Sequence, residues 1–141
     1  MRQPGWAIVI DSSVLIAMAL GRSSYALVAA VKRHRLLVTD IAAAESQKRI
    51  ELGLKAPEHV PDLRAAVALM NMIPAADLPT EHAKAVLRDA VASRNGSVAD
   101  AHILACAWTF DADIWSSDRD FAGTGVASWS TANLMRALEQ T

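Results

Sequence analysis

Several features are scarce in this sequence, and each scarcity argues against a class of protein. The 141 residues include one cysteine, Cys106, so no internal disulfide can form and we expect a reducing, cytoplasmic setting. Asp11 interrupts the best apolar run well before the roughly 20 residues of a membrane span, so we expect neither a transmembrane helix nor a secretory leader. The net charge is only −1, which gives no sign of a strongly basic nucleic-acid-binding domain.

Motifs for nucleotide and zinc binding are also missing. There is no P-loop pattern, and Gly123-x-Gly125 is too short for a dinucleotide fingerprint. The four histidines show no metal-ligand spacing. His102 follows Asp100 by two residues, about 200° around a helix, so the two side chains point apart. We therefore expect a structural role for His102.

The sequence does contain many short apolar runs at regular intervals. Hydrophobic residues make up 52% of the chain and charged residues 21%, which is typical of a folded protein, and we expect one domain over residues 1–141. Apolar runs of strand length alternate with helical patterns, and this alternation predicts a three-layer α/β/α fold around a short parallel sheet of about four or five strands. The expected strands are residues 6–10, 36–39, 72–74 at an edge, 114–115 and 126–129.

Capping residues predict where the helices lie between these strands. Gly21 should end a first helix over residues 14–20, and Ser23 or Ser24 should begin a second. Asp40 and Thr131 are the expected N-caps of two later helices. The other expected helices cover residues 57–72, 81–93 and 97–110, and the four tryptophans, Trp6, Trp108, Trp115 and Trp129, are expected in the core.

Four acidic residues fall where a parallel sheet places its functional sites. Asp11 ends the first strand, Asp118 follows the strand at 114–115, and Glu45 and Asp100 lie near the starts of helices. Sites in such folds form at the carboxyl ends of strands, where four carboxylates would repel one another unless a cation lay among them. Oxygen ligands favour Mg²⁺ or Mn²⁺, which can activate water for phosphodiester cleavage.

Each acid alone also has a structural interpretation. Asp11 can cap the helix that follows it, and Asp100 can complete a capping box with Ser97. Glu45 can pair with a basic residue one turn later, and Asp118 can serve a turn. The four together, at one expected rim of the sheet, favour a metal site.

The acids also lie in four motifs whose order resembles a known family. The motifs are Ile-Val-Ile-Asp11-Ser-Ser-Val-Leu-Ile-Ala, Thr-Asp-Ile-Ala-Ala-Ala-Glu45, Ala-Asp100-Ala-His-Ile-Leu-Ala and Ser-Ser-Asp118-Arg-Asp120-Phe121. Together they resemble the PIN domain, and the small size resembles the VapC toxins of bacterial toxin–antitoxin pairs. The resemblance implies a Mg²⁺- or Mn²⁺-dependent endoribonuclease, usually a homodimer, held inactive by a cognate antitoxin protein encoded beside it.

The resemblance also implies a role for each matching residue. Asp11 and Asp100 match the main metal ligands, and Asp118 matches the fourth acid. Glu45 matches the helical glutamate that binds metal directly or through water. Ser116 or Ser117 matches a supporting position. Asp40 competes with Glu45, and Asp120 is a further candidate acid.

An RNA substrate requires basic side chains near the cleavage site. Arg94 and Arg119 lie nearest the expected rim and are the first candidates for contacting phosphate. The other candidates are Arg22, Arg33, Arg35, Lys48 and Arg49.

Two other functions remain open on the sequence. One is a non-catalytic PIN-like binding domain, which would have no affinity for metal. The other is a phosphatase that uses Asp11 as a nucleophile, although Ser13 stands where that class has a second acid and the expected lysine partner is absent.

Overall fold

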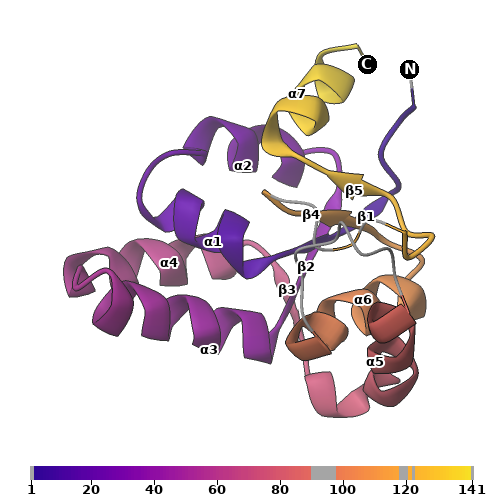
Figure 1. The fold of residues 1–141 in the computed structure, drawn as a ribbon. Coiled ribbons are helices and arrows are strands. Elements are labelled where there is room, and N and C mark those ends of the chain that lie inside the picture. Colours follow the sequence, from indigo (N-terminus) through magenta and orange to yellow (C-terminus); the bar gives the residue numbers. More distant parts are fainter. Residues whose placement is uncertain (1, 90–97, 118–120, 122, 141) are drawn as a thin grey trace.

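The computed structural model describes residues 2–89, 98–117, 121 and 123–140. Within these residues, five strands form one entirely parallel sheet in the order β3-β2-β1-β4-β5 (Figure 1). All four residues of the central strand β1 are buried, as a strand covered on both faces requires. The strands are β1 (Ala7–Ile10), β2 (Arg35–Thr39), β3 (Asn71–Ile73), β4 (Asp113–Trp115) and β5 (Ser128–Trp129).

Helices cover the sheet in two groups, which Figure 1 shows on either side of it. Helix α6 packs on β1, β2 and β4 and carries α5 on its outer side, whereas α1, α3 and α4 pack on one another and α2 pairs with α7. The predicted α/β fold with a parallel sheet is confirmed. The α-helices of the described residues are α1 (Ser12–Ala19), α2 (Ser24–Val31), α3 (Asp40–Lys48), α4 (Val60–Val67), α5 (Thr80–Asp89), α6 (Ala101–Thr109) and α7 (Thr131–Glu139).

Two of the predicted N-caps are wrong by one residue. Thr39, not Asp40, caps α3, because its hydroxyl accepts the Ala42 N–H at 3.0 Å and its backbone is still extended. Asp40 instead accepts the backbone N–H of Ala75 at 2.9 Å. Ser130, not Thr131, caps α7. Thr39 is itself the last residue of β2 and Ser130 directly follows β5, so each helix begins one residue before the pattern indicates.

Two helices are more interrupted than their apolar spacing predicts. The helix that Asp40 is expected to cap changes after Lys48 into the π-helical turn Arg49–Gly53. The helix expected over residues 57–72 is a 3-10 turn, Pro57–His59, followed by the shorter α4. Periodicity alone does not distinguish these turns from an α-helix, because the apolar residues recur at similar intervals in all three.

The tryptophans divide between core and surface. Trp115 and Trp129 are buried. The indole N–H of Trp115 donates to Thr131 Oγ1 at 3.0 Å, and that of Trp129 donates to Asp113 Oδ2 at 2.9 Å. Trp108 is half-buried beside the His82 ring. The core prediction is wrong for Trp6, which precedes β1 and is 70% exposed.

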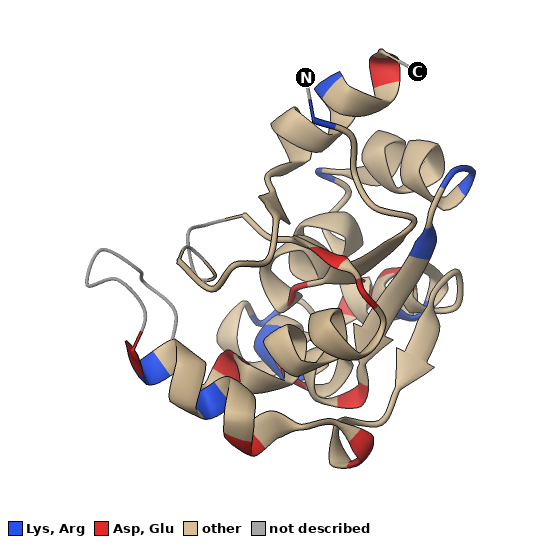
Figure 2. Cartoon of the chain, turned by 90° about the vertical axis from the view of Figure 1, so that its right-hand side faces the viewer, with Lys and Arg blue, Asp and Glu red and all other residues tan. Residues whose placement is uncertain are grey.

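Charged residues of both signs are interspersed over helices and loops, and α5 carries both (Figure 2). Across the described ranges, no single helix is both long and apolar enough to cross a membrane; α1 and α2 meet that test only as a pair bent by 115°.

Candidate functional site

Asp11 lies at the carboxyl end of β1, and its carboxylate is oriented by three donors from two segments, the start of α1 and the residue after β4. Its side chain is only 3% exposed. Oδ1 accepts the backbone N–H of Ser12 at 2.8 Å, which makes Asp11 the N-cap of α1. Oδ2 accepts the hydroxyls of Ser116 at 2.8 Å and Ser13 at 3.3 Å. The capping and site interpretations of Asp11 are therefore compatible, since one residue satisfies both.

The two candidate supporting serines differ in what they contact. Ser116 follows β4, is 1% exposed, and donates its hydroxyl to Asp11. Ser117 is exposed, and it is its backbone N–H that donates to Ser13 Oγ, at 3.3 Å. Of the two, Ser116 is the residue whose side chain touches a candidate metal ligand.

Glu45 and Asp100 come to the same rim from other elements. Glu45 lies on α3, and Asp100 ends the 3-10 turn Val98–Asp100 that precedes α6. Although much of the Glu45 side chain is exposed, partial desolvation of its carboxylate raises its pKa, and the negative charges of Asp100 and Asp11 raise it further. Three of the four predicted acids are therefore near enough to repel one another.

The structural interpretations of Glu45 and Asp100 fare differently. In the described part of the chain, Glu45 forms no ion pair with Lys48 or Arg49. Asp100 occupies the N-cap position of α6, but its side chain makes no capping hydrogen bond there. The other half of the expected capping box, Ser97, lies outside the described residues.

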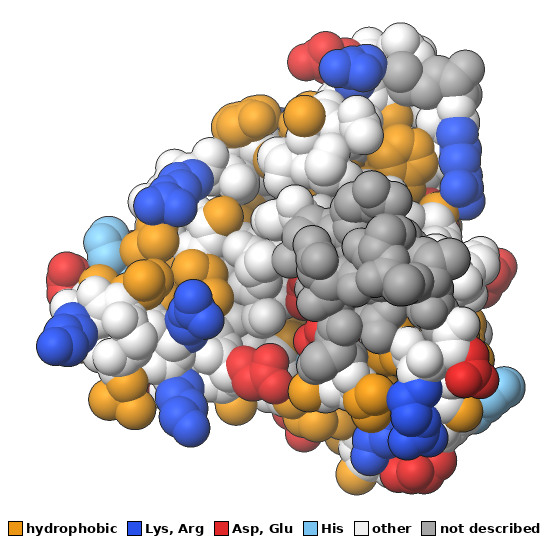
Figure 3. Space-filling model, in the orientation of Figure 1, with side chains coloured by type: hydrophobic (Ala, Val, Ile, Leu, Met, Phe, Trp, Pro, Cys, Tyr) orange, Lys and Arg blue, Asp and Glu red, His pale blue; other side chains and the backbone are white. Residues whose placement is uncertain are grey.

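Asp11 and Asp100 face a common pocket of about 460 Å³. Arg49 lines this pocket and also a second one of about 270 Å³, which Glu45 lines as well. Figure 3 shows acidic side chains near the centre of this face and Lys and Arg side chains beside them, over α1, α3 and α4. The remaining residues of the larger pocket are Ser12, Ser13, Ile16, Leu20, Arg22 and Leu54.

Part of the predicted site lies outside the described residues, namely Asp118, Asp120, Arg94 and Arg119. Among the residues that are described, no three His, Cys, Asp or Glu side chains gather closely enough to form a ready metal cluster. Asp40, the competitor of Glu45, lines neither pocket and uses its carboxylate to bind backbone N–H groups.

The donor set nevertheless fits a hard divalent cation. Asp11, Glu45 and Asp100 offer carboxylate oxygens, and no histidine or cysteine lines either pocket. Oxygen donors suit Mg²⁺ or Mn²⁺, whereas zinc sites are built mainly with nitrogen and sulfur. Partial neutralisation by a bound cation would also relieve the repulsion that raises the Glu45 pKa.

His102 lies in the first turn of α6, two residues after Asp100, and is buried. Its Nδ1 is 2.7 Å from Thr39 Oγ1, and its buried Nε2 has no hydrogen-bond partner among the described residues. Desolvation lowers its pKa, against the opposing effect of the Asp100 and Asp40 charges, so the ring is neutral at physiological pH. This placement agrees with the structural role expected for it.

The arginines of the larger pocket, Arg22 and Arg49, were not the first candidates on the sequence. Sequence distance from the acids favoured Arg94 and Arg119, whereas Arg22 follows α1 and Arg49 follows α3. The sequence signal for Arg22 is Gly21, which ends α1 with a positive φ; Arg49 begins the π-helical turn that follows α3, which the sequence pattern does not reveal.

Comparison with known proteins identifies a matching family and several solved structures of similar fold. The model of the PIN domain family matches residues 9–139. PAE2754 from Pyrobaculum aerophilum superposes with a TM-score of 0.71 at 15% identity, covering 96% of each chain. VapBC2 from Rickettsia felis, bound to promoter DNA, gives 0.67 at 13% identity over 88% of this chain and 98% of that one. A toxin–antitoxin complex from Klebsiella pneumoniae gives 0.64 at 22% identity, over 88% and 97%.

These identities are low, so the structural likenesses establish a shared fold. Among proteins of curated function, none matches the sequence significantly.

Proposed function

The chain belongs to the PIN domain family, and from this premise we propose that it is a metal-dependent endoribonuclease, the toxin of a VapBC-type toxin–antitoxin pair. The observation that carries the proposal is the approach of Asp11, Glu45 and Asp100 to one rim of the sheet, where desolvation raises the pKa of Glu45 and the charges of Asp100 and Asp11 raise it further. The family match favours this function over a phosphatase with Asp11 as its nucleophile.

In this proposal, Asp11 and Asp100 are the main ligands of Mg²⁺ or Mn²⁺, with Glu45 and Asp118 completing the set. When bound, the ion supplies Lewis-acid polarisation of the scissile phosphate and lowers the pKa of the attacking water. The hydroxyl of Ser116 keeps the Asp11 carboxylate in one orientation. Glu45, exposed and with a raised pKa, is suited to orient the attacking water and accept a proton from it.

Cleavage of total RNA tests the proposal. The antitoxin-free protein is incubated with Mg²⁺, with Mn²⁺ or with EDTA, beside an Asp100→Asn variant. We expect cleavage that requires metal and is lost in the variant. If the variant cuts as well as the wild type, the activity is a contaminant and the assignment of Asp100 is wrong.

A titration with Mn²⁺ decides what an inactive result means. If no RNA is cut but Mn²⁺ raises the melting temperature of the wild type and not of Asp100→Asn, the metal site is present and the target RNA is narrow. If Mn²⁺ has no effect on either protein, the non-catalytic alternative is favoured.

We also propose an antitoxin partner and a homodimer, in the cytoplasm. One of the similar structures is the toxin–antitoxin complex from Klebsiella pneumoniae. This chain has exposed apolar side chains, such as Val28 and Leu69, around a groove of about 370 Å³ between α1, α2 and α4. Co-purification with the product of the neighbouring gene, and light scattering of the isolated chain, test the two partners separately.

A further inference from the structure

Two arginines line the same pocket as the candidate metal ligands. Arg22 and Arg49 face the 460 Å³ pocket together with Asp11 and Asp100. Both arginines are exposed, and in the described ranges neither guanidinium forms an ion pair. Two unneutralised cations beside a group of carboxylates need an explanation, because simple charge neutralisation would have placed them in contact with the acids.

The backbone fixes the position of Arg22. Helix α1 ends in a Schellman motif, in which Gly21 donates to the Met18 carbonyl at 3.0 Å and Arg22 donates to the Ala17 carbonyl at 2.9 Å. Gly21 has a φ of +82°, which a glycine adopts without strain. The turn therefore places Arg22 at the pocket directly after the helix that Asp11 caps.

A different device positions Arg49. The π-helical turn Arg49–Gly53 is closed by a bond of 2.8 Å from the Leu54 N–H to the Arg49 carbonyl. The Arg49 side chain runs along Gly53, so closely that a Cβ there would lie 3.3 Å from Arg49 Cδ. This packing directs the guanidinium along the turn, and π-turns are often found at functional sites.

We propose that Arg22 and Arg49 bind RNA phosphates on the two sides of the scissile bond and so position the strand over the carboxylates. The inference rests on the proposed function and adds Arg22 and Arg49 to the predicted RNA contacts Arg94 and Arg119, which lie outside the described residues. Guanidinium groups suit phosphate because their fork of donors matches its oxygens. Ile16, Leu20 and Leu54 provide an apolar wall in the same pocket, against which a sugar or base can pack.

Binding of RNA without cleavage tests the two arginines directly. The probe is a fluorescein-labelled single-stranded RNA of mixed sequence, and its anisotropy is followed in EDTA at several salt concentrations. Arg22→Ala and Arg49→Ala should each weaken binding by about tenfold and reduce the slope of log affinity against log salt by about 0.7. Arg→Lys variants should recover the salt slope, because the charge is retained.

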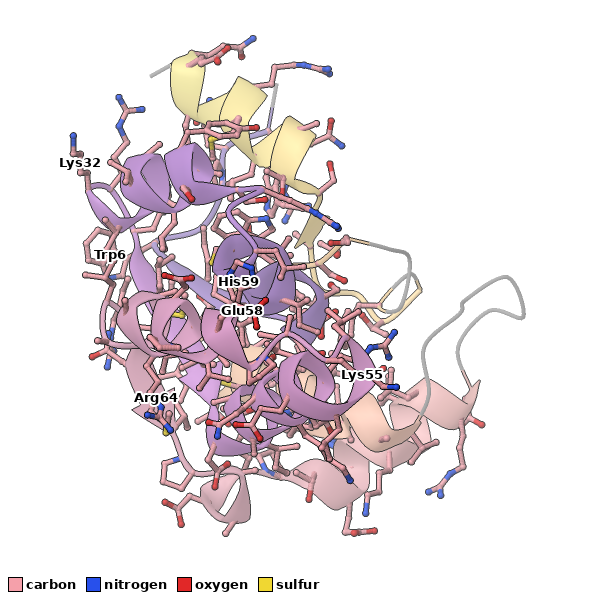
Figure 4. All side chains as sticks on the ribbon, turned by 90° about the vertical axis from the view of Figure 1, so that its left-hand side faces the viewer. Trp6, Lys32, Lys55, Glu58, His59 and Arg64 are labelled. Atoms are coloured by element: carbon pink, nitrogen blue, oxygen red, sulfur yellow. The ribbon has the colours of Figure 1, made fainter. Side chains whose placement is uncertain are left out.

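Matched controls come from arginine and lysine residues elsewhere. Lys32, at the end of α2, and Arg64, on α4, are exposed and line neither pocket; Figure 4 labels both. Lys32→Ala and Arg64→Ala should bind RNA as the wild type does. Equal losses in the controls would overturn the proposal, because they would show a dependence on total charge alone.

The stabilisation by Mn²⁺ separates substrate binding from damage to the site. In both arginine variants, the rise in melting temperature on adding Mn²⁺ should match that of the wild type. If a variant loses both this Mn²⁺ response and its RNA binding, the proposal is overturned in favour of a structural role for the arginine. If the wild type cleaves RNA and both arginine variants bind RNA as tightly as it does, this inference alone is refuted. If the wild type neither binds nor cleaves RNA, the nuclease function itself is refuted.

Discussion

The hydroxyl of Thr39 and the ring of His102 are joined by a 2.7 Å hydrogen bond between residues 63 positions apart. Thr39 ends β2 and caps α3, the helix of Glu45, while His102 is in the first turn of α6, which Asp100 precedes. Both groups are buried. One bond therefore links the two helices that bring Glu45 and Asp100 to the rim of the sheet.

Thr39→Val should destabilise the protein by about 1–3 kcal/mol, because it removes the cap of α3 and leaves Nδ1 of His102 unpaired. Thr39→Ser retains the oxygen and should stay within about 0.5 kcal/mol of the wild type. Urea unfolding of the three proteins measures both values. Equal stability of the valine and serine variants would contradict a structural role for the hydroxyl.

Ser116→Ala should weaken metal binding by about 10- to 100-fold, since Asp11 loses a buried donor that orients its carboxylate. Calorimetry with Mn²⁺ gives the affinity. Ser117→Ala is the matched control, because Ser117 contacts Ser13 through its backbone. The control should bind Mn²⁺ as the wild type does.

Glu45→Gln should have opposite effects with and without metal. In EDTA the substitution removes a charge that Asp11 and Asp100 repel, so the melting temperature should rise by about 1–3 °C. The additional rise on adding Mn²⁺ should be smaller than in the wild type, because one carboxylate ligand is lost. Thermal melts of both proteins, with and without Mn²⁺, measure the two effects; a lower melting temperature in EDTA would argue against repulsion at this site.

Gly21→Ala should destabilise the chain by about 1–2 kcal/mol, because a side chain at a φ of +82° is strained even though nothing lies within 4 Å of the added Cβ. Asn tolerates this conformation better, so Gly21→Asn should lose less stability. If the Schellman turn positions Arg22, the alanine variant should also bind RNA more weakly than the asparagine variant. Urea unfolding and RNA anisotropy provide the comparison.

Cys106 provides a test at alkaline pH. Burial raises the pKa of its thiol to about 12, from an ordinary value of 9.0. The folded state thus holds the proton more tightly than the unfolded state, so this contribution to stability is complete below about pH 9 and decreases as the pH rises toward about 12. The free energy of unfolding of the wild type should fall more steeply above about pH 9 than that of Cys106→Ala. Parallel slopes would show that the thiolate is tolerated in the fold.

The sheet was predictable because its strands are short, apolar and separated by helical patterns. Ile8, Val9 and Ile10 can only be buried on both faces, and this places β1 at the centre. Cap positions were less predictable, because Thr39 and Asp40 are both good caps and only the end of the strand decides between them. The exposure of Trp6 was missed since its apolar neighbours belong to the strand and it does not.

For the candidate site, the carboxyl-end rule located Asp11, and helix starts located Glu45 and Asp100. The partners of these acids were not predictable in detail. Ser116 contacts Asp11 across 105 positions, and a sequence alone does not show which of two adjacent serines turns inward. Arg22 and Arg49 depend on how α1 and α3 end, which is a matter of turn geometry.

Asp11 begins a helix and also faces the pocket, so natural selection has two separate reasons to keep it. A relative that had lost its reaction would still need a cap for the helix and would retain an aspartate at this place. The Glu45 side chain has no comparable role in folding, because it is exposed and makes no hydrogen bond in the described part of the chain. Under the proposed function, the presence or loss of a glutamate at the position of Glu45 is therefore the better marker for separating active relatives from inactive ones.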